Sequence, residues 1–193
     1  SAITEDEIVS SYSGVRPLYE DHAASNSTVT RDYVFELDNE GGAPILSVYG
    51  GKITTYRKLA EHALEKLGRV LALPGKAWTA NAPLPGGDMP DGDFAAFLWR
   101  ISERYEWLPP EMLLRLARAY GTRIEAVIGS AGSLGELGAH MGGNLYEAEL
   151  RYLFDAEYAR TAQDVLWRRS KLGLHLPVGA QQAVADWFAA QTS

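Results

Sequence analysis

One run of the sequence predicts a strand that ends in a tight turn and leads directly into a helix. The strand is the apolar, β-branched run at residues 45–49, and it stops at Gly50 and Gly51, where the backbone can turn without a Cβ in the way. A helix is predicted over residues 55–67, where apolar side chains recur at helical spacing behind two threonines suited to capping it. Such a unit points backbone N–H groups and the positive end of the helix dipole at whatever occupies the turn. On shape alone, the pattern also fits an ordinary turn between a strand and a helix.

The composition limits the size of the core and the kinds of partner. A chain of 193 residues with 46% hydrophobic content is long enough for one full core, or for one core and a smaller appendage. The net charge of −7 argues against binding to nucleic acid or to an anionic lipid surface, because both need a basic face. The absence of cysteine removes disulfides, thiolate nucleophiles and thiolate metal ligands. No apolar run has the length of a membrane-spanning helix and no signal peptide opens the sequence, so we expect a cytoplasmic protein.

The sequence divides into a short mixed segment and a longer helical one. Alternating apolar residues at positions 30–37 predict a half-buried strand. Residues 74–92 contain four prolines and four glycines, which is typical of a linker or a meandering loop. Beyond it, five or six short amphipathic helices predict a compact helical domain. We expect these helices to begin near Asp93, Pro110, Thr122, Asn144 and Thr161, with a last one around Val184.

No metal site or phosphate loop is predicted. The four histidines have no metal-ligand spacing, and His62 falls on the polar face of the predicted helix, so we expect them to be solvated or hydrogen-bonded rather than catalytic. The glycines between residues 129 and 138 fit neither phosphate-loop pattern and indicate a connection between helices. Glu147 and Glu149 lie two positions apart on a predicted helix, which places them on different faces and argues against a paired-carboxylate site.

Several motifs of this sequence resemble one enzyme family. GGKITTYRKLAEHALEKL at residues 50–67, YSGVRPL at residues 12–18 and TRDYVF at residues 30–35 resemble, in order and rough spacing, motifs of the FAD-dependent respiratory glycerol-3-phosphate dehydrogenases. GNLYEAELRYL at residues 143–153 and DVLWRR at residues 164–169 resemble the C-terminal region of the same family. The dinucleotide-binding GxGxxG motif with which those enzymes begin does not occur in this sequence. The resemblance therefore implies that the chain is the C-terminal part of such an enzyme.

The resemblance implies a mainly α fold with four parts. Residues 1–44 would form the end of the substrate-binding sheet, and residues 45–73 would supply the last strand and helix of the FAD domain. Residues 74–90 would be a linker, and residues 91–193 an all-helical C-terminal domain with its own core. The first two parts are expected to be a small α+β piece severed from larger domains, and the missing N-terminal FAD domain is their expected partner.

Two arginines are the residues that the resemblance assigns to the substrate. Arg16 and Arg31 match residues that hold the phosphate and the glycerol end of sn-glycerol 3-phosphate, and the planar fork of arginine suits phosphate oxygens. Each lies beside a turn or at the start of a strand, where an arginine taken alone is more often part of a surface ion pair. Lys52 and Arg57 are further basic candidates for the same anion.

The turn after the second strand is the part that the resemblance assigns to the cofactor. The residues along the pyrimidine edge of the flavin ring would be Gly50, Gly51, Lys52, Ile53 and Thr54. There a lysine and backbone N–H groups would stabilise the negative charge that reduced flavin carries. The alternative is that Lys52 extends from the turn into solvent. No catalytic residue and no metal ligand is assigned in this sequence, and a base for the hydride step would lie in the missing half.

The activity that the resemblance implies is oxidation of sn-glycerol 3-phosphate to dihydroxyacetone phosphate, with a hydride passed to FAD and electrons then passed to a quinone. We expect the chain alone to be inactive and to bind FAD weakly or not at all, because the glycine-rich pyrophosphate turn is missing. The full-length enzyme would be cytoplasmic or peripheral on the cytoplasmic membrane, could form a homo-oligomer, and would not bind nucleic acid. Two alternatives stay open: a related oxidase that uses oxygen, and a non-catalytic helical module for dimer or partner contacts.

Overall fold

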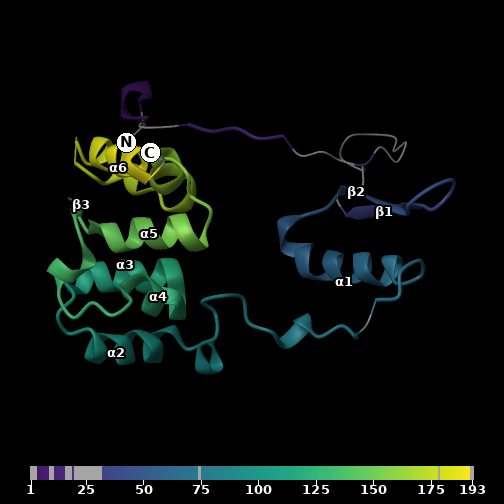
Figure 1. The fold of residues 1–193 in the computed structure, drawn as a ribbon, viewed down its shortest axis with the longest axis horizontal. Helices are drawn as coiled ribbons and strands as arrows, with labels where there is room; N and C mark the ends of the chain where they lie inside the picture. Colours follow the sequence, from purple (N-terminus) through teal and green to yellow (C-terminus); the bar gives the residue numbers. More distant parts are fainter. Residues whose placement is uncertain are drawn as a thin grey trace. The chain divides into compact units, whose positions relative to one another are not determined.

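The computed structural model describes residues 4–8, 11–15, 19, 32–73, 75–177 and 179–191. The chain forms two compact units that divide between Ala82 and Pro83, inside the segment that the sequence assigned to a linker. The first unit is a β-hairpin with one long helix, and the second is almost entirely helical (Figure 1). The prediction of a mainly α fold with a small α+β piece at its start is confirmed.

The first unit is built on an antiparallel hairpin. Strand β1 (Tyr33–Asp38) pairs with strand β2 (Ile45–Gly50), and the register places Tyr33 opposite Gly50 and Asp38 opposite Ile45. None of the described residues up to position 82 is fully buried, so this unit has no closed hydrophobic core of its own. Two-stranded hairpins are marginally stable in isolation, and this one is covered on one side by a helix.

That helix is α1 (Tyr56–Leu67), which follows β2 through a short 3₁₀ turn at Ile53–Thr55. Its bounds agree with the predicted helix to within one residue. Thr55 occupies the N-cap position, but its hydroxyl donates to the carbonyl oxygen of Lys52 at 2.8 Å instead of capping a helical amide. Gly68 follows the last helical residue, as the sequence predicts.

The second unit holds the hydrophobic core of the chain. Its α-helices are α2 (Phe94–Arg104), α3 (Pro110–Tyr120), α4 (Ile124–Ile128), α5 (Glu147–Ala156) and α6 (Ala180–Gln191), with a π-helical segment at Asp164–Arg169. Helices α3 and α4 lie between α2 and α5 (Figure 1). The residues at the centre of the core are large and almost fully enclosed: Leu116, Ile124, Leu145, Leu150, Leu153, Val165 and Val184.

The short elements complete this unit. Strands β3 (His140–Gly142) and β4 (Leu145–Tyr146) form a small antiparallel ribbon that the expectation of an all-helical domain did not include. Single 3₁₀ turns occupy Glu5–Glu7 and Thr79–Asn81 in the first unit, and Pro90–Gly92, Gly121–Arg123, Leu134–Leu137 and Leu172–Leu174 in the second. No helix in the described ranges is long and apolar enough to cross a membrane.

Three of the predicted helix boundaries have the expected local chemistry. The carboxylate of Asp93 accepts hydrogen bonds from the amides of Ala95 and Ala96 at the start of α2. Pro110 opens α3, and Gly121 ends it with a φ of 55°, which a residue with a Cβ rarely adopts. Thr161 and Asp164 exchange hydrogen bonds before the π-helical segment.

Besides Thr55, two predicted helix caps are wrong, because neither side chain bonds to an amide of the helix that it was predicted to cap. Helix α4 begins at Ile124, and the hydroxyl of Thr122 donates to the carboxylate of Asp88 rather than to its own helix. Helix α5 begins at Glu147, after the β3–β4 ribbon, and no side chain caps it. Asn144 lies in the turn of that ribbon, where its backbone carbonyl oxygen accepts a hydrogen bond from the guanidinium of Arg115.

The second half of the predicted linker belongs to the helical unit. Gly86 is buried, and its carbonyl oxygen accepts a hydrogen bond from the amide of Thr122 at 3.1 Å. Gly86 and Gly121 approach each other so closely that a Cβ on either would collide with backbone of the other chain segment. The backbone after Ala82 is therefore fixed onto the end of α3, which explains why the division between units falls there.

Candidate functional site

The turn between β2 and α1 has a backbone shape that suits glycine. Gly50 and Gly51 have φ values of 69° and 94°, in the left-handed region that L-residues rarely adopt. A Cβ on Gly51 would lie 3.4 Å from Cβ of Tyr33 and 3.5 Å from Cδ1 of Leu59. A Cβ on Gly51 would therefore face strand β1 and helix α1 at ordinary contact distances, and it is the positive φ that favours glycine here.

Backbone donors are available at this turn. The amide of Thr55 donates to the carbonyl of Lys52 at 3.0 Å, which closes the 3₁₀ turn. The amides of Ile53 and Thr54, at the start of that turn, donate to no other group within the described part of the chain. Amides in this position carry the positive end of the helix dipole, so they favour a ligand atom with negative charge.

The side chains on the turn add a cation and an apolar surface. Lys52 is exposed and forms no ion pair with any described residue. Ile53 is 89% exposed, which is unusual for an isoleucine in a folded chain. A free lysine, free amides and an open glycine backbone on one turn suit a flat ring that becomes anionic when it is reduced.

Arg57, a further basic candidate for the substrate phosphate, is paired within the first unit. Its Nη1 donates to Oε1 of Glu61 at 2.9 Å and to the hydroxyl of Thr79 at 3.3 Å. Lys58 also reaches Glu61, at 3.3 Å. The hydrogen bond from Thr79, followed by those basic neighbours, lowers the pKa of the Glu61 carboxyl below its ordinary value despite some desolvation. This network ties α1 to the 3₁₀ turn at Thr79–Asn81.

Arg16 and Arg31 lie outside the described residues, so their assignment to substrate stays a prediction. A tyrosine close to each in the sequence is described. The hydroxyl of Tyr19 donates to Oε1 of Glu36 at 3.0 Å, which raises the pKa of the phenol, and its ring lies 5.6 Å from that of Tyr49. The hydroxyl of Tyr33 forms a hydrogen bond of 2.5 Å with Nδ1 of His62. Among the described residues, the tyrosine nearest to each arginine in the sequence therefore forms a side-chain hydrogen bond to another residue of the first unit.

Comparison with known proteins places the chain in a family. Residues 77–192 match the family model described as the C-terminal domain of alpha-glycerophosphate oxidase. The chain belongs to this family. The match covers the helical unit and thus agrees with the resemblance that the motifs carry.

Longer similarities extend over nearly the whole chain. It is 46% identical over 191 residues to the aerobic glycerol-3-phosphate dehydrogenase of Escherichia coli (strain K12), which covers 98% of this chain and 38% of that protein. It is 44% identical over 186 residues to the D-erythritol 1-phosphate dehydrogenase of Brucella abortus (strain 2308), covering 96% of this chain and 37% of the relative. A glycerol-3-phosphate dehydrogenase of Pseudomonas aeruginosa is 46% identical over 183 residues, or 94% and 36% of the two chains. The chain therefore spans little more than a third of the length of these relatives.

The helical unit of this chain contains a buried charge network that the sequence did not predict. Glu149 on α5 is 2% exposed and accepts hydrogen bonds from Arg115 at 2.8 and 2.7 Å and from the hydroxyl of Tyr120 at 2.7 Å. Burial, and then the negative charge of Glu149, raises the pKa of Tyr120 well above its ordinary value, so its proton stays in place. The one signal of this network in the sequence is the position of Glu149 among apolar residues that belong to the core, Leu145, Leu150 and Leu153. The network joins α3 to α5.

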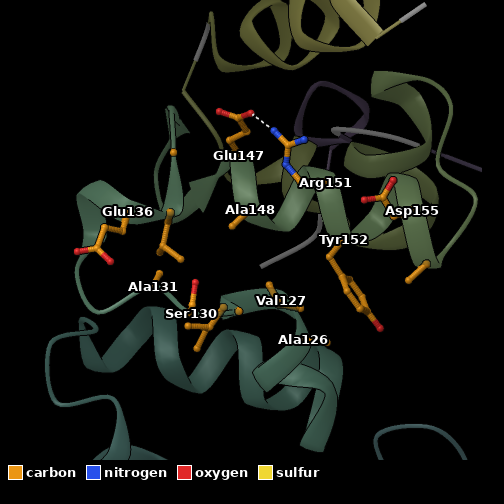
Figure 2. A pocket seen from close by; sticks show the side chains of 15 residues that line it. Ala126, Val127, Ser130, Ala131, Glu136, Glu147, Ala148, Arg151, Tyr152 and Asp155 are labelled. Atoms are coloured by element: carbon orange, nitrogen blue, oxygen red, sulfur yellow. Dashed lines mark hydrogen bonds and ion pairs between the residues drawn. The ribbon is translucent and has the colours of Figure 1, made fainter.

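A surface hollow of about 730 Å³ lies beside the end of α4 and along α5 of the same domain (Figure 2). Glu147 in its wall pairs with Arg151 at 2.6 Å, and Glu136 accepts from the amide of Gly132 and the hydroxyl of Ser133. Glu147 and Glu149 face different partners, as their spacing predicted. Within the described ranges no group of acidic and histidine side chains could hold a metal ion. The polar groups of this hollow largely satisfy one another, so it is not a strong candidate for catalysis.

Proposed function

We propose that this chain is the C-terminal part of an FAD-dependent dehydrogenase that oxidises sn-glycerol 3-phosphate to dihydroxyacetone phosphate. The observation that carries the proposal is the turn at residues 50–54, which combines two glycines of positive φ with amides and a lysine that have no partner among the described residues. The family of the helical unit and the names of the relatives support the same substrate.

The residues of the turn fit a flavin, which when bound would supply the acceptor of the hydride. Gly50 and Gly51 would form the tight turn at which the ring approaches the backbone, since both have positive φ. The amides of Ile53 and Thr54 and the ammonium of Lys52 would hold negative charge on the pyrimidine edge. These groups are positioned before the reaction by the closed 3₁₀ turn at Ile53–Thr55, so they would need little rearrangement as the charge develops.

The substrate would be held by arginine. Arg16 and Arg31 are proposed to bind the phosphate and the glycerol end, because their planar forks can form paired hydrogen bonds to oxygen. The commitment of Arg57 to Glu61 and Thr79 supports this choice among the basic residues of the first unit. The base that removes the hydroxyl proton is proposed to lie outside this chain.

Two comparisons each suggest an alternative at the same site, one for the substrate and one for the final electron acceptor. One relative is named for D-erythritol 1-phosphate, so the proposed enzyme could act on that longer polyol phosphate. The matching family model is named for an oxidase, so oxygen is the alternative to quinone as the final electron acceptor. In each case a secondary alcohol would become a ketone by losing a proton and a hydride. The hydride carries the two electrons that would reach the final acceptor.

The experiment is a steady-state assay of the full-length protein with measured flavin content. Both polyol phosphates are offered with a quinone analogue under anaerobic conditions, and then in air with detection of hydrogen peroxide. We expect stoichiometric FAD, a higher kcat/KM for sn-glycerol 3-phosphate, and turnover that depends on the quinone. A flavin-free protein that oxidises neither compound would contradict the proposal. Peroxide formation at the rate of turnover would favour the oxidase.

The remaining roles of the chain follow from this proposal. Residues 1–44 and 45–73 would complete the substrate and FAD domains, residues 74–90 would connect them to the rest, and residues 91–193 would form the helical domain. That domain has its own core, which supports its folding as a separate unit. A role in contacts with a second copy or with a partner is the alternative that we retain for it. The full-length enzyme is proposed to be cytoplasmic or peripheral on the cytoplasmic membrane, where it would meet quinone.

A further inference from the structure

We propose that Tyr33 and His62 are a positioning pair that holds the turn at residues 50–54 against helix α1. Its catalytic consequence rests on the proposed function, since that function assigns the turn to the flavin. Neither residue is proposed to touch substrate or cofactor. They would act through the backbone of Gly50 and Gly51.

Tyr33 lies directly behind the turn. The strand register places it opposite Gly50, the last residue of β2. Its Cβ is also the nearest atom to the position that a Cβ on Gly51 would take, at 3.4 Å. Any movement of the Tyr33 backbone or ring is therefore transmitted to both glycines, which have no side chains of their own to hold them in place.

Helix α1 holds Tyr33 from the other side. His62 accepts or donates a 2.5 Å hydrogen bond with the Tyr33 hydroxyl, and the two rings lie 5.9 Å apart. Leu59, three residues earlier and hence on the same face of the helix, contacts the position of Gly51. Among the residues that the structure describes, the Tyr33–His62 bond is the single side-chain hydrogen bond between the hairpin and α1.

Within this chain, which spans little more than a third of the length of its relatives, apolar packing between the hairpin and α1 is thin. No described residue of the first unit is fully buried, and α1 has no buried side chain. Where few contacts fix an element, a single hydrogen bond has a larger effect on how often the local structure opens. The sequence prediction that His62 is hydrogen-bonded rather than catalytic agrees with this role.

The first test measures hydrogen–deuterium exchange of the peptide covering residues 47–56 in full-length protein from which the flavin has been removed. Tyr33→Phe removes the hydroxyl and keeps the ring, and His62→Ala favours helix, so both variants should fold. We expect exchange of the hydrogen-bonded amides of this peptide, such as that of Thr55, to rise roughly three- to tenfold in each variant, with no further rise in the double variant. Tyr158→Phe, at an exposed tyrosine of the helical unit, is the matched control and should exchange like wild type.

The second test measures reduction of bound flavin by sn-glycerol 3-phosphate in a stopped-flow instrument. We expect the limiting rate to fall several-fold in both variants while flavin content stays normal, and His62→Gln to restore much of it because its amide can bond to Tyr33. Exchange and reduction rates equal to wild type, or single effects that multiply in the double variant, would overturn the pair. A wild-type protein without flavin would instead refute the proposed function, and the exchange data would still decide whether the pair holds the turn.

Discussion

Glu149→Gln should destabilise the helical unit far more than the same change at an exposed ion pair. Glu149 is 2% exposed, and both of its oxygens accept from Arg115. Glutamine removes the charge and places an N–H₂ group where one of these acceptors was, which leaves the half-buried guanidinium without its counter-charge, although Nη2 keeps the backbone carbonyl of Asn144 as an acceptor. Breaking a buried pair in this way costs about 3–5 kcal/mol, which corresponds to a fall in melting temperature of roughly 10 °C or more for a unit of this size.

The assay is urea unfolding of the 193-residue chain followed by tryptophan fluorescence, since Trp107 and Trp187 are packed against the core. Glu125→Gln is the control, because Glu125 pairs with Arg104 at 2.5 Å while both side chains are more than half exposed. Such a pair contributes no more than about 1 kcal/mol. If Glu149→Gln lowers the free energy of unfolding by no more than Glu125→Gln does, the network is not the stabilising contact that its burial indicates.

Three further predictions concern the proposed site and one surface carboxylate. Lys52→Met in the full-length enzyme should lower the flavin midpoint potential and slow reduction by substrate, and a loss of about 1.4 kcal/mol of differential stabilisation would appear as roughly 30 mV in a spectroelectrochemical titration. Arg16→Ala and Arg31→Ala should each lower kcat/KM by an amount equivalent to roughly 2–4 kcal/mol, with normal flavin content. Replacement of either arginine by lysine should also lower kcat/KM, because a point charge replaces a planar fork. Wild-type kinetics in both alanine variants would show that the two arginines have a structural role only. Backbone and side-chain hydrogen bonds from Arg160 and Thr161 lower the pKa of Asp164 from 3.8 to about 2, so the stability that it contributes is present above pH 4 and is lost as the pH falls from about 4 to 2. The difference in unfolding free energy between wild type and Asp164→Asn should therefore shrink over that range, and a constant difference would contradict it.

The sequence predicted those parts of the fold that neighbouring residues decide. The turn at Gly50 and Gly51, the bounds of α1 and the Asp93 cap each depend on residues within a few positions of one another. The caps at Thr122 and Asn144 failed for the opposite reason. Thr122 bonds to Asp88, which is 34 positions away, and a local capping pattern carries no information on such a competitor.

The candidate site shows the same limit. The shape of the turn at residues 50–54 could be predicted from the sequence because the glycines and the start of the helix are contiguous, whereas its assignment to the flavin depends on the resemblance and stays a prediction. The bond between Tyr33 and His62 joins residues 29 positions apart, and the pair of Arg115 and Glu149 joins residues 34 positions apart. Neither follows from a spacing rule, since each depends on how strands and helices pack. Arg16 and Arg31 lie outside the described residues, and their role as substrate ligands stays a prediction.

The proposed chemistry and the stability of this chain depend on different units. The turn, its lysine and the Tyr33–His62 bond lie in the first unit, where no described residue is fully buried, whereas the core and the Arg115–Glu149 network lie in the second. Substitutions that share no contacts generally have additive effects, and we expect this of residues in separate units. A change at Lys52 should then alter flavin chemistry and leave the core unfolding transition unchanged, while a change at Glu149 should do the reverse.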